Sequence, residues 1–150
     1  MKIKVINGPN LNFLGIREKD IYGSGSYDDL IAYIRDYCDR EQIEVSFFQS
    51  NHEGALIDEI QACYGEFDGI VINPGGYTMT SIALLDAVRA VSLPTVEVHI
   101  SDMDNREPFR KISYIGMACI RIISGLGFDG YIEAIKEVKS FILTHSGTVL

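Results

Sequence analysis

Residues 69–78 read GIVINPGGYT, and this stretch decides the expected fold. Its first part, Gly69 to Ile72, is continuously apolar and too short for a helix, which is typical of a strand buried on both faces of a parallel sheet. Asn, Pro and Gly follow at once, and these residue types favour a turn. A second apolar segment, Ile3 to Ile6, runs in the same way into Asn7-Gly8-Pro9-Asn10. We therefore expect two buried parallel strands, each ending in a polar turn.

The same alternation of short apolar segments and helical patterns extends over the whole chain. Buried strands are expected at residues 3–6, 45–48, 69–72, 95–98 and 119–123. Helical faces are formed by Leu30, Ile34 and Cys38, by Leu56, Ile60 and Cys63, by Leu84, Val88 and Val91, and by a last amphipathic stretch from about Tyr131 to Leu143. Strands that alternate with helices predict a parallel sheet with helices on both faces. With five strands, we expect a flavodoxin-like, three-layer α/β/α fold.

Two residue pairs with capping-box spacing mark where the first two helices are expected to begin. They are Ser26 with Asp29, and Ser50 with Glu53. In a capping box the Ser hydroxyl and the acidic side chain each accept a hydrogen bond from the other residue's backbone N–H. We interpret His52 as part of the second helix start, with a catalytic role as the alternative.

The composition excludes several classes of protein. The chain has 150 residues, 47% of them hydrophobic, which predicts one globular domain over residues 1–150. A net charge of -8 disfavours nucleic-acid binding, which depends on clustered Lys and Arg. No apolar stretch approaches the roughly 18 residues of a membrane span, and no signal-peptide pattern is present. Three cysteines without CxxC spacing indicate reduced thiols, so we expect a cytoplasmic protein without membrane association.

Four of the expected strands run into polar turns. These turns are residues 7–12, 49–52, 73–78 and 97–101, and they carry neutral amides, hydroxyls and His99. Open α/β sheets bind ligands at the carboxyl ends of their strands. We therefore expect these groups to orient a polar small molecule by hydrogen bonds. The alternative is that Asn, Gly and Pro only make turns.

Two long loops, residues 11–25 and 101–113, interrupt the rhythm of strands and helices. Loops of this length in a compact domain are usually lids or binding loops. The first carries Arg17, and the second carries Arg106 and Arg110. Because Arg offers a bidentate fork, these cations are candidates for a carboxylate clamp. A solvated surface loop with internal ion pairs is the alternative.

Tyr22 lies five residues after Arg17 in the first loop. A positive charge beside a phenol favours the phenolate, which can act as a base. Half-ionisation at pH 7 requires the phenol pKa to fall from about 10 to about 7. One Arg supplies only part of that change, so a closed lid or a second cation has to supply the rest. The alternative is that Tyr22 is a packing residue.

Several common functional motifs are incomplete or absent in this sequence. Residues 125–130 match GxGxxG, but no strand and acidic residue follow as dinucleotide binding requires, so we expect a tight strand-to-helix turn there. A phosphate-receiver domain needs Asp at the ends of the first and third strands, where this chain has Asn7 and Asn73. His52, His99 and His145 lack metal-ligand spacing, and no lysine lies at an expected strand end for imine chemistry. We therefore expect neither a metal nor an organic cofactor.

Taken together, the polar blocks resemble the type II 3-dehydroquinate dehydratase family. The blocks are residues 6–12 (INGPNLN), 14–18 (LGIRE), 21–23 (IYG), 49–54 (QSNHEG), 72–75 (INPG), 97–101 (EVHIS), 106–110 (REPFR) and 125–127 (GLG). They occur in the family's order and spacing over nearly the whole chain. The resemblance implies dehydration of 3-dehydroquinate to 3-dehydroshikimate without a cofactor, in a flavodoxin-like domain that assembles as trimers and then as dodecamers.

The resemblance also implies a role for each matched residue. Tyr22 would be the base, Arg17 would hold it as phenolate, His99 with Glu97 would be the acid, and Asn10 would steady the enolate through a water. The substrate ligands would be Asn73, Ile100, Ser101, Met79 and Arg110, with Arg106 supporting the lid at residues 11–25. Asp86 would reach into the site of a neighbouring subunit.

The sequence departs from the family pattern at a few positions. Residues 78–81 read TMTS where the family has Thr-His-Thr-Ser, so Met79 replaces a His that binds a substrate hydroxyl. Leu85 replaces an Arg, and Asp104-Asn105 replaces His-Ala. The proposed acid, base and activating Arg remain. Two other functions stay open: a degenerate relative that binds a quinate-like acid without turnover, and a flavodoxin-like module that binds protein or flavin.

Overall fold

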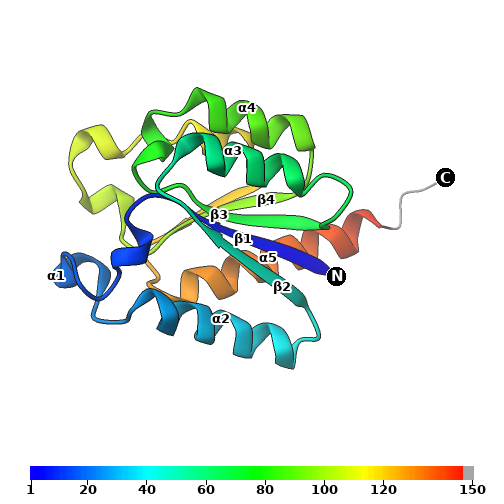
Figure 1. The fold of residues 1–150 in the computed structure, drawn as a ribbon, viewed down its shortest axis with the longest axis horizontal. Coiled ribbons are helices and arrows are strands. Elements are labelled where there is room, and N and C mark those ends of the chain that lie inside the picture. Colours follow the sequence, from blue (N-terminus) through cyan, green and yellow to red (C-terminus); the bar gives the residue numbers. More distant parts are fainter. Residues whose placement is uncertain (147–150) are drawn as a thin grey trace.

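A computed structural model of the chain describes residues 1–146, with the backbone alone at Tyr22. Five parallel strands form one sheet in the order β2-β1-β3-β4-β5 (Figure 1). The strands are β1 (Lys2–Asn7), β2 (Glu44–Gln49), β3 (Gly69–Asn73), β4 (Thr95–His99) and β5 (Arg121–Ser124). This order confirms the expected flavodoxin-like fold. Residues 147–150 of the expected domain lie outside the described part of the chain.

Helices cover both faces of the sheet (Figure 1). The α-helices are α1 (Lys19–Tyr22), α2 (Tyr27–Arg40), α3 (Glu53–Ala62), α4 (Ile82–Val91) and α5 (Asp129–His145). Short 3-10 helices are η1 (Leu11–Phe13), η2 (Gly75–Met79), η3 (Met103–Asn105), η4 (Pro108–Arg110) and η5 (Ile115–Ala118). Helices α2 and α5 pack on one face, and α3 and α4 pack on the other. Within residues 1–146, no helix is both long and apolar enough to cross a membrane.

The central strands contribute side chains to two hydrophobic cores. In β1, Ile3 and Val5 pack beneath α2 and α5, whereas Ile6 packs beneath α3 and α4. In β3, Val71 faces the first core, and Ile70 and Ile72 face the second. Because successive side chains point to opposite faces, a strand buried on both faces needs an unbroken apolar run. This requirement explains the apolar segments from which the sheet was predicted.

The two outer strands are less buried than expected. All residues of β2 are partly or fully exposed, and Ile122 of β5 is 44% exposed. Strand β5 begins at Arg121, two residues later than the expected start at Cys119. The prediction that all five strands are buried is therefore wrong for β2 and β5. Both are edge strands, and each has a neighbour on one side only.

One of the two predicted capping boxes is formed. At the start of α2, the Ser26 hydroxyl accepts from the Asp29 backbone N–H at 3.0 Å, and Asp29 accepts from the Ser26 backbone at 2.9 Å. The second prediction is wrong, because α3 begins directly at Glu53 with His52 as its N-cap. The Ser50 hydroxyl instead accepts from the His52 backbone N–H at 3.0 Å. Glu53 is the first residue of α3, whereas a capping box needs the acidic side chain at the third position of the helix.

The loops after β1 and β3 diverge from a point of very close contact. The Gly8 backbone N–H donates to the Asn73 carbonyl at 2.7 Å. A Cβ atom at Gly8 would lie 2.5 Å from the Pro74 carbonyl oxygen, so no larger residue fits there. The chain winds to opposite sides of the sheet from β1 and β3, and this switch point is where such folds bind ligands. The close contact therefore positions the two loops that border the site.

Candidate active site

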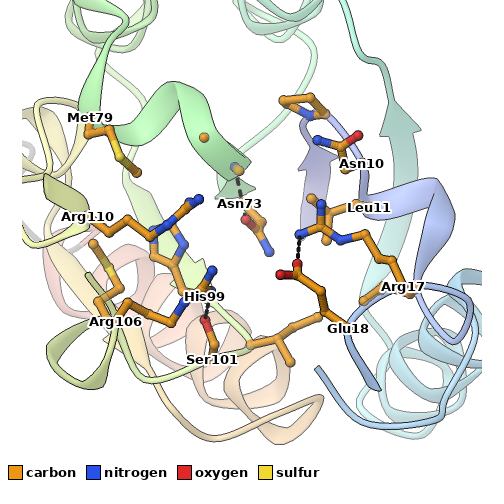
Figure 2. Close-up of a pocket in the computed structure, with 16 residues that line it drawn as sticks. Asn10, Leu11, Arg17, Glu18, Asn73, Met79, His99, Ser101, Arg106 and Arg110 are labelled. Carbon is orange, nitrogen blue, oxygen red and sulfur yellow. Dashed lines mark hydrogen bonds and ion pairs between the residues drawn. The ribbon is translucent and has the colours of Figure 1, made fainter. Parts of the chain in front are cut away.

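A cavity of about 200 Å³ lies at the carboxyl ends of β1, β3 and β4 (Figure 2). Its volume is below the roughly 300–1,000 Å³ of pockets for drug-sized ligands, so it suits a small molecule. Residues from the strand ends form one side: Asn73, Met79, His99, Ile100 and Ser101. Residues from the loop after β1 and from the loop after β4 complete it: Asn10, Arg17, Arg106 and Arg110. The structure thus brings together most of the site residues that the sequence predicted.

Three guanidinium groups give the cavity its positive character. Arg17 lies 3.4 Å from the Glu18 carboxylate, measured from Nη2 to Oε2. Arg106 donates to the Ser101 hydroxyl at 3.1 Å, and Arg110 Nε lies 2.8 Å from a Glu107 carboxylate oxygen. The hydrogen bond from its own backbone N–H, together with the charges of Arg110 and Arg106, holds the pKa of Glu107 below its usual range. These three cations line the cavity, whereas Glu18 is the single carboxylate among the described lining residues, and this balance favours an anionic ligand.

A buried carboxylate supports the imidazole that faces the cavity. Glu97, in the middle of β4, is 0% exposed, and its Oε1 atom lies 2.6 Å from His99 Nε2. Thr78 donates to Oε1 at 3.0 Å, and Ser113 donates to Oε2 at 2.5 Å. A buried charge is tolerated when it is fully hydrogen-bonded. We assign the ring hydrogen to Nε2, because it faces the carboxylate, and this leaves Nδ1 for a ligand.

The structure does not test the expected roles of Tyr22 and Asp86. Asp86 lies on the exposed surface of α4 and does not line the cavity. The side chain of Tyr22, the expected base, lies outside the described residues. Its backbone ends α1, in the same segment as Arg17. The structure therefore leaves the expected roles of Tyr22 and Asp86 as predictions.

Sequence reasoning missed several residues that complete the site. Leu11 and Leu14 are buried and form an apolar part of the cavity wall, next to Glu18. Thr78 and Ser113 were also missed, although they hold Glu97 in place. The carboxylate in the middle of the apolar segment 95–98 was the available signal, because a buried carboxylate must find donors in other segments.

Within residues 1–146, His, Cys, Asp and Glu side chains form no group of three that could hold a metal ion. Burial raises the pKa of the Cys38 and Cys63 thiols to about 11. Burial raises the pKa of Cys119 as well, with the nearby Glu97 as a second cause. These cysteines are therefore protonated near pH 7 and are poor nucleophiles or metal ligands.

Comparisons with known proteins agree with this geometry. The family model described as dehydroquinase class II matches residues 1–139. The chain belongs to the class II dehydroquinase family. A 3-dehydroquinate dehydratase from Fusobacterium nucleatum is 58% identical over 138 residues, which cover 90% of this chain and 94% of that protein. One from Clostridium acetobutylicum is 54% identical over 142 residues, covering 95% of this chain and 99% of the relative.

Solved structures give the same result. The type II dehydroquinase from Butyrivibrio crossotus has a TM-score of 0.91 and 55% identity, and the match covers 93% of this chain and 97% of that one. Relatives of this similarity, which carry the name of an active enzyme, do not favour the degenerate, non-catalytic alternative. A protein- or flavin-binding module is disfavoured for the same reason.

We predict that Thr78 stabilises the fold through Glu97. A Thr78→Val substitution keeps the shape of the side chain but removes one donor to the buried carboxylate. We expect the free energy of unfolding to fall by roughly 1.5–3 kcal/mol, because hydrogen bonds to charged groups are worth about this much. Urea denaturation measures the change.

Thr80→Val is the matched control. Thr80 lies two residues away in the same loop, is exposed, and makes no side-chain hydrogen bond within the described residues. Its substitution should change the free energy of unfolding by less than about 0.5 kcal/mol. Equal stabilities of the two variants would contradict the role given to Thr78.

Proposed function

We propose that this chain removes water from 3-dehydroquinate to give 3-dehydroshikimate, as a hydro-lyase. One observation carries the proposal: His99, held by the fully hydrogen-bonded Glu97, faces a small, positively charged cavity in a class II dehydroquinase fold. The substrate is a small cyclic anion, which suits that cavity. Relatives named 3-dehydroquinate dehydratase match almost the whole chain.

In the proposed mechanism, His99 is the general acid. It donates a proton to the hydroxyl group that leaves as water, and Glu97 stabilises the imidazolium form beforehand. Tyr22, as phenolate, removes the proton from the carbon beside the ketone, and Arg17 favours that phenolate. The electrons of the broken C–H bond form the enolate. The enolate then collapses to the new C=C bond as the hydroxyl, protonated by His99, leaves as water. Both proton-transfer groups are side chains, so this scheme requires no cofactor.

The anchoring of the substrate follows from the donors on the rim. Asn73 and the residues after β4, Ile100 and Ser101, would take the carboxylate. The Ser101 hydroxyl accepts a hydrogen bond from Arg106 Nη1 at 3.1 Å, which fixes its position and supports this assignment. Arg110 would bind a ring hydroxyl, and Asn10 would steady the enolate through a water. Each of these assignments follows from the family pattern and from the position of the residue in the cavity wall.

Residues 11–25 are proposed as the lid of a single catalytic domain that spans residues 1–150. Leu14 and Arg17 of this segment line the cavity, so its position affects access to the site. Glu18 adopts a left-handed conformation with φ of 38°, which is unusual for a residue other than glycine. Strain of this kind is often stored where a segment changes conformation.

We also propose assembly into trimers and dodecamers in the cytoplasm. Asp86 would then complete the site of a neighbouring subunit, since it lies outside the cavity of its own chain. Exposed apolar side chains support an interface of this kind: Ile82 beside it on α4 is 50% exposed, and Met117 is 61% exposed. The high pKa values of Cys38 and Cys63 agree with thiols that stay reduced.

The proposed mechanism makes a testable prediction about the base. Purified protein mixed with 3-dehydroquinate should produce the ultraviolet absorbance of the conjugated enone product. Tyr22→Phe should lower kcat by at least 10²-fold, because a general base typically contributes 10²–10⁴-fold. The control is Tyr33→Phe, on the exposed side of α2, which should leave kcat unchanged within about twofold. Near-normal turnover by Tyr22→Phe would falsify the assignment of the base.

A separate prediction concerns Met79, which lies on the same side of the cavity as Arg110 (Figure 2). The family has His at this position, and a thioether cannot donate the hydrogen bond that an imidazole donates. Met79→His should therefore raise kcat/KM by about tenfold, which corresponds to roughly 1.4 kcal/mol. Steady-state kinetics with 3-dehydroquinate measure the change.

Met103→His is the control for position, because Met103 also lines the cavity. It should give no comparable gain, since the family pattern places no imidazole there. If Met79→His leaves an already efficient enzyme unchanged, another group must bind that hydroxyl, and the explanation for Met79 fails.

A further inference from the structure

A tyrosine outside the cavity lies directly behind one of its walls. Tyr131, in the first turn of α5, is 0% exposed and does not line the cavity. Its hydroxyl reaches the carboxyl ends of β1 and β3, where Asn7 and Asn73 are paired in the sheet. Neither the sequence motifs nor the proposed mechanism assigns a function to Tyr131. A Phe would fill nearly the same volume without burying a polar group, so the hydroxyl requires an explanation.

The hydrogen bonds around this hydroxyl form a chain in which each group donates to the next, from Asn73 through Tyr131 and Asn7 to Tyr27. Tyr131 donates to Asn7 Oδ1 at 2.6 Å and accepts from Asn73 Nδ2 at 3.0 Å. Asn7 Nδ2 donates onward to the Tyr27 hydroxyl at 3.4 Å. Burial raises the pKa of the Tyr131 phenol, so the hydroxyl keeps its proton and its role as donor to Asn7.

This network fixes both ends of the Asn73 amide. Its Oδ1 atom accepts from the Gly75 backbone N–H at 3.1 Å, and its Nδ2 atom donates to Tyr131. A flipped amide would bring Nδ2 toward the Gly75 N–H, so two donors would face each other. One N–H of Asn73 therefore remains for a ligand, and Figure 2 shows the amide pointing toward the middle of the cavity.

We propose that Tyr131 is a positioning residue that holds Asn73 as a hydrogen-bond donor to the carboxylate of the substrate. The inference rests on the proposed function, in which Asn73 takes the substrate carboxylate. Without the Tyr131 hydroxyl, Asn73 Nδ2 loses a partner in a site where the residue is only 3% exposed. The amide is then held only at its oxygen end, by the Gly75 N–H, and its N–H donors are no longer fixed in the direction of the carboxylate. Tyr131 touches neither the acid nor the base, so it affects binding rather than proton transfer.

The test is Tyr131→Phe, with both kcat and KM measured for 3-dehydroquinate. We expect KM to rise roughly tenfold, since a net hydrogen bond of ordinary strength has been lost, while kcat stays within about threefold. Tyr27→Phe is the matched control, because Tyr27 belongs to the same network but touches Asn7 and not Asn73. It should leave KM unchanged within about twofold.

Two further measurements separate positioning from packing. In an Asn73→Ala background, the rise in KM caused by Tyr131→Phe should disappear, because residues that act through each other are not additive. In nuclear magnetic resonance spectra of the ligand-free protein, the Asn73 side-chain amide should show slowly exchanging protons that lose their protection in Tyr131→Phe. A KM effect that persists without Asn73, or a lower melting temperature with unchanged KM, would overturn the proposal.

Binding of quinate, a hydroxylated cyclic carboxylate, distinguishes this proposal from the proposed function. If the wild-type protein binds quinate without turning over 3-dehydroquinate, and Tyr131→Phe weakens that binding, the proposed function fails and the positioning role stands. If wild-type turnover is normal and Tyr131→Phe changes neither KM nor quinate affinity, the positioning role fails and the proposed function stands.

Discussion

The structure of the site depends on one buried charge, the carboxylate of Glu97. A carboxylate with 0% exposure is costly by several kcal/mol unless donors surround it. The donors come from separate segments: Thr78 from η2, Ser113 from the loop before η5, and His99 from the end of β4 itself. Satisfying this charge therefore ties the loop after β3 and the loop after β4 to the sheet. These two loops form one wall of the cavity.

A second polar cluster supports the neighbouring part of the rim. Asn7, Asn73 and Tyr131 form a hydrogen-bonded group behind the ends of β1 and β3, and it is as deeply buried as Glu97. Each buried side-chain N or O atom of the described residues, including those of both clusters, has at least one hydrogen-bond partner. Fully satisfied buried networks rigidify their surroundings. The rim thus provides a fixed platform, against which the segment of residues 11–25 completes the cavity.

The parts predicted from the sequence are those that local patterns determine. An apolar run such as residues 69–72 indicates a strand that is buried on both faces. The polar turn that follows it indicates the edge of the sheet that borders the cavity. The edge strands were predicted less well, because a pattern of apolar residues does not reveal whether a strand has one neighbour or two. Thr78, Ser113 and Tyr131 could not be predicted, since their hydrogen bonds join distant segments. Tyr131 and Asn7, for example, are 124 residues apart in the chain.

The GxGxxG stretch, residues 125–130, connects β5 to α5. It was predicted to be a tight turn between strand and helix, and Gly125 and Gly127 have φ of 82° and 59°, which other residues rarely adopt. This turn sets where α5 begins and therefore where Tyr131 enters the core. The sequence predicted the turn correctly but could not show what the turn positions, because that depends on the packing of α5 against β3 and β4.

The proposed mechanism is an anti elimination, in which the acid on β4 and the base on the N-terminal segment act from opposite faces of the substrate. Figure 2 shows Arg17 and His99 on opposite sides of the cavity, which agrees with this arrangement. The most direct measurement uses 3-dehydroquinate in which deuterium replaces one of the two hydrogens on the carbon between the ketone and the carbon that bears the leaving hydroxyl. Mass spectrometry of the product then shows whether the deuterium is lost. An anti elimination removes the hydrogen on the ring face opposite the leaving hydroxyl. Loss of the hydrogen on the same face as that hydroxyl would contradict it.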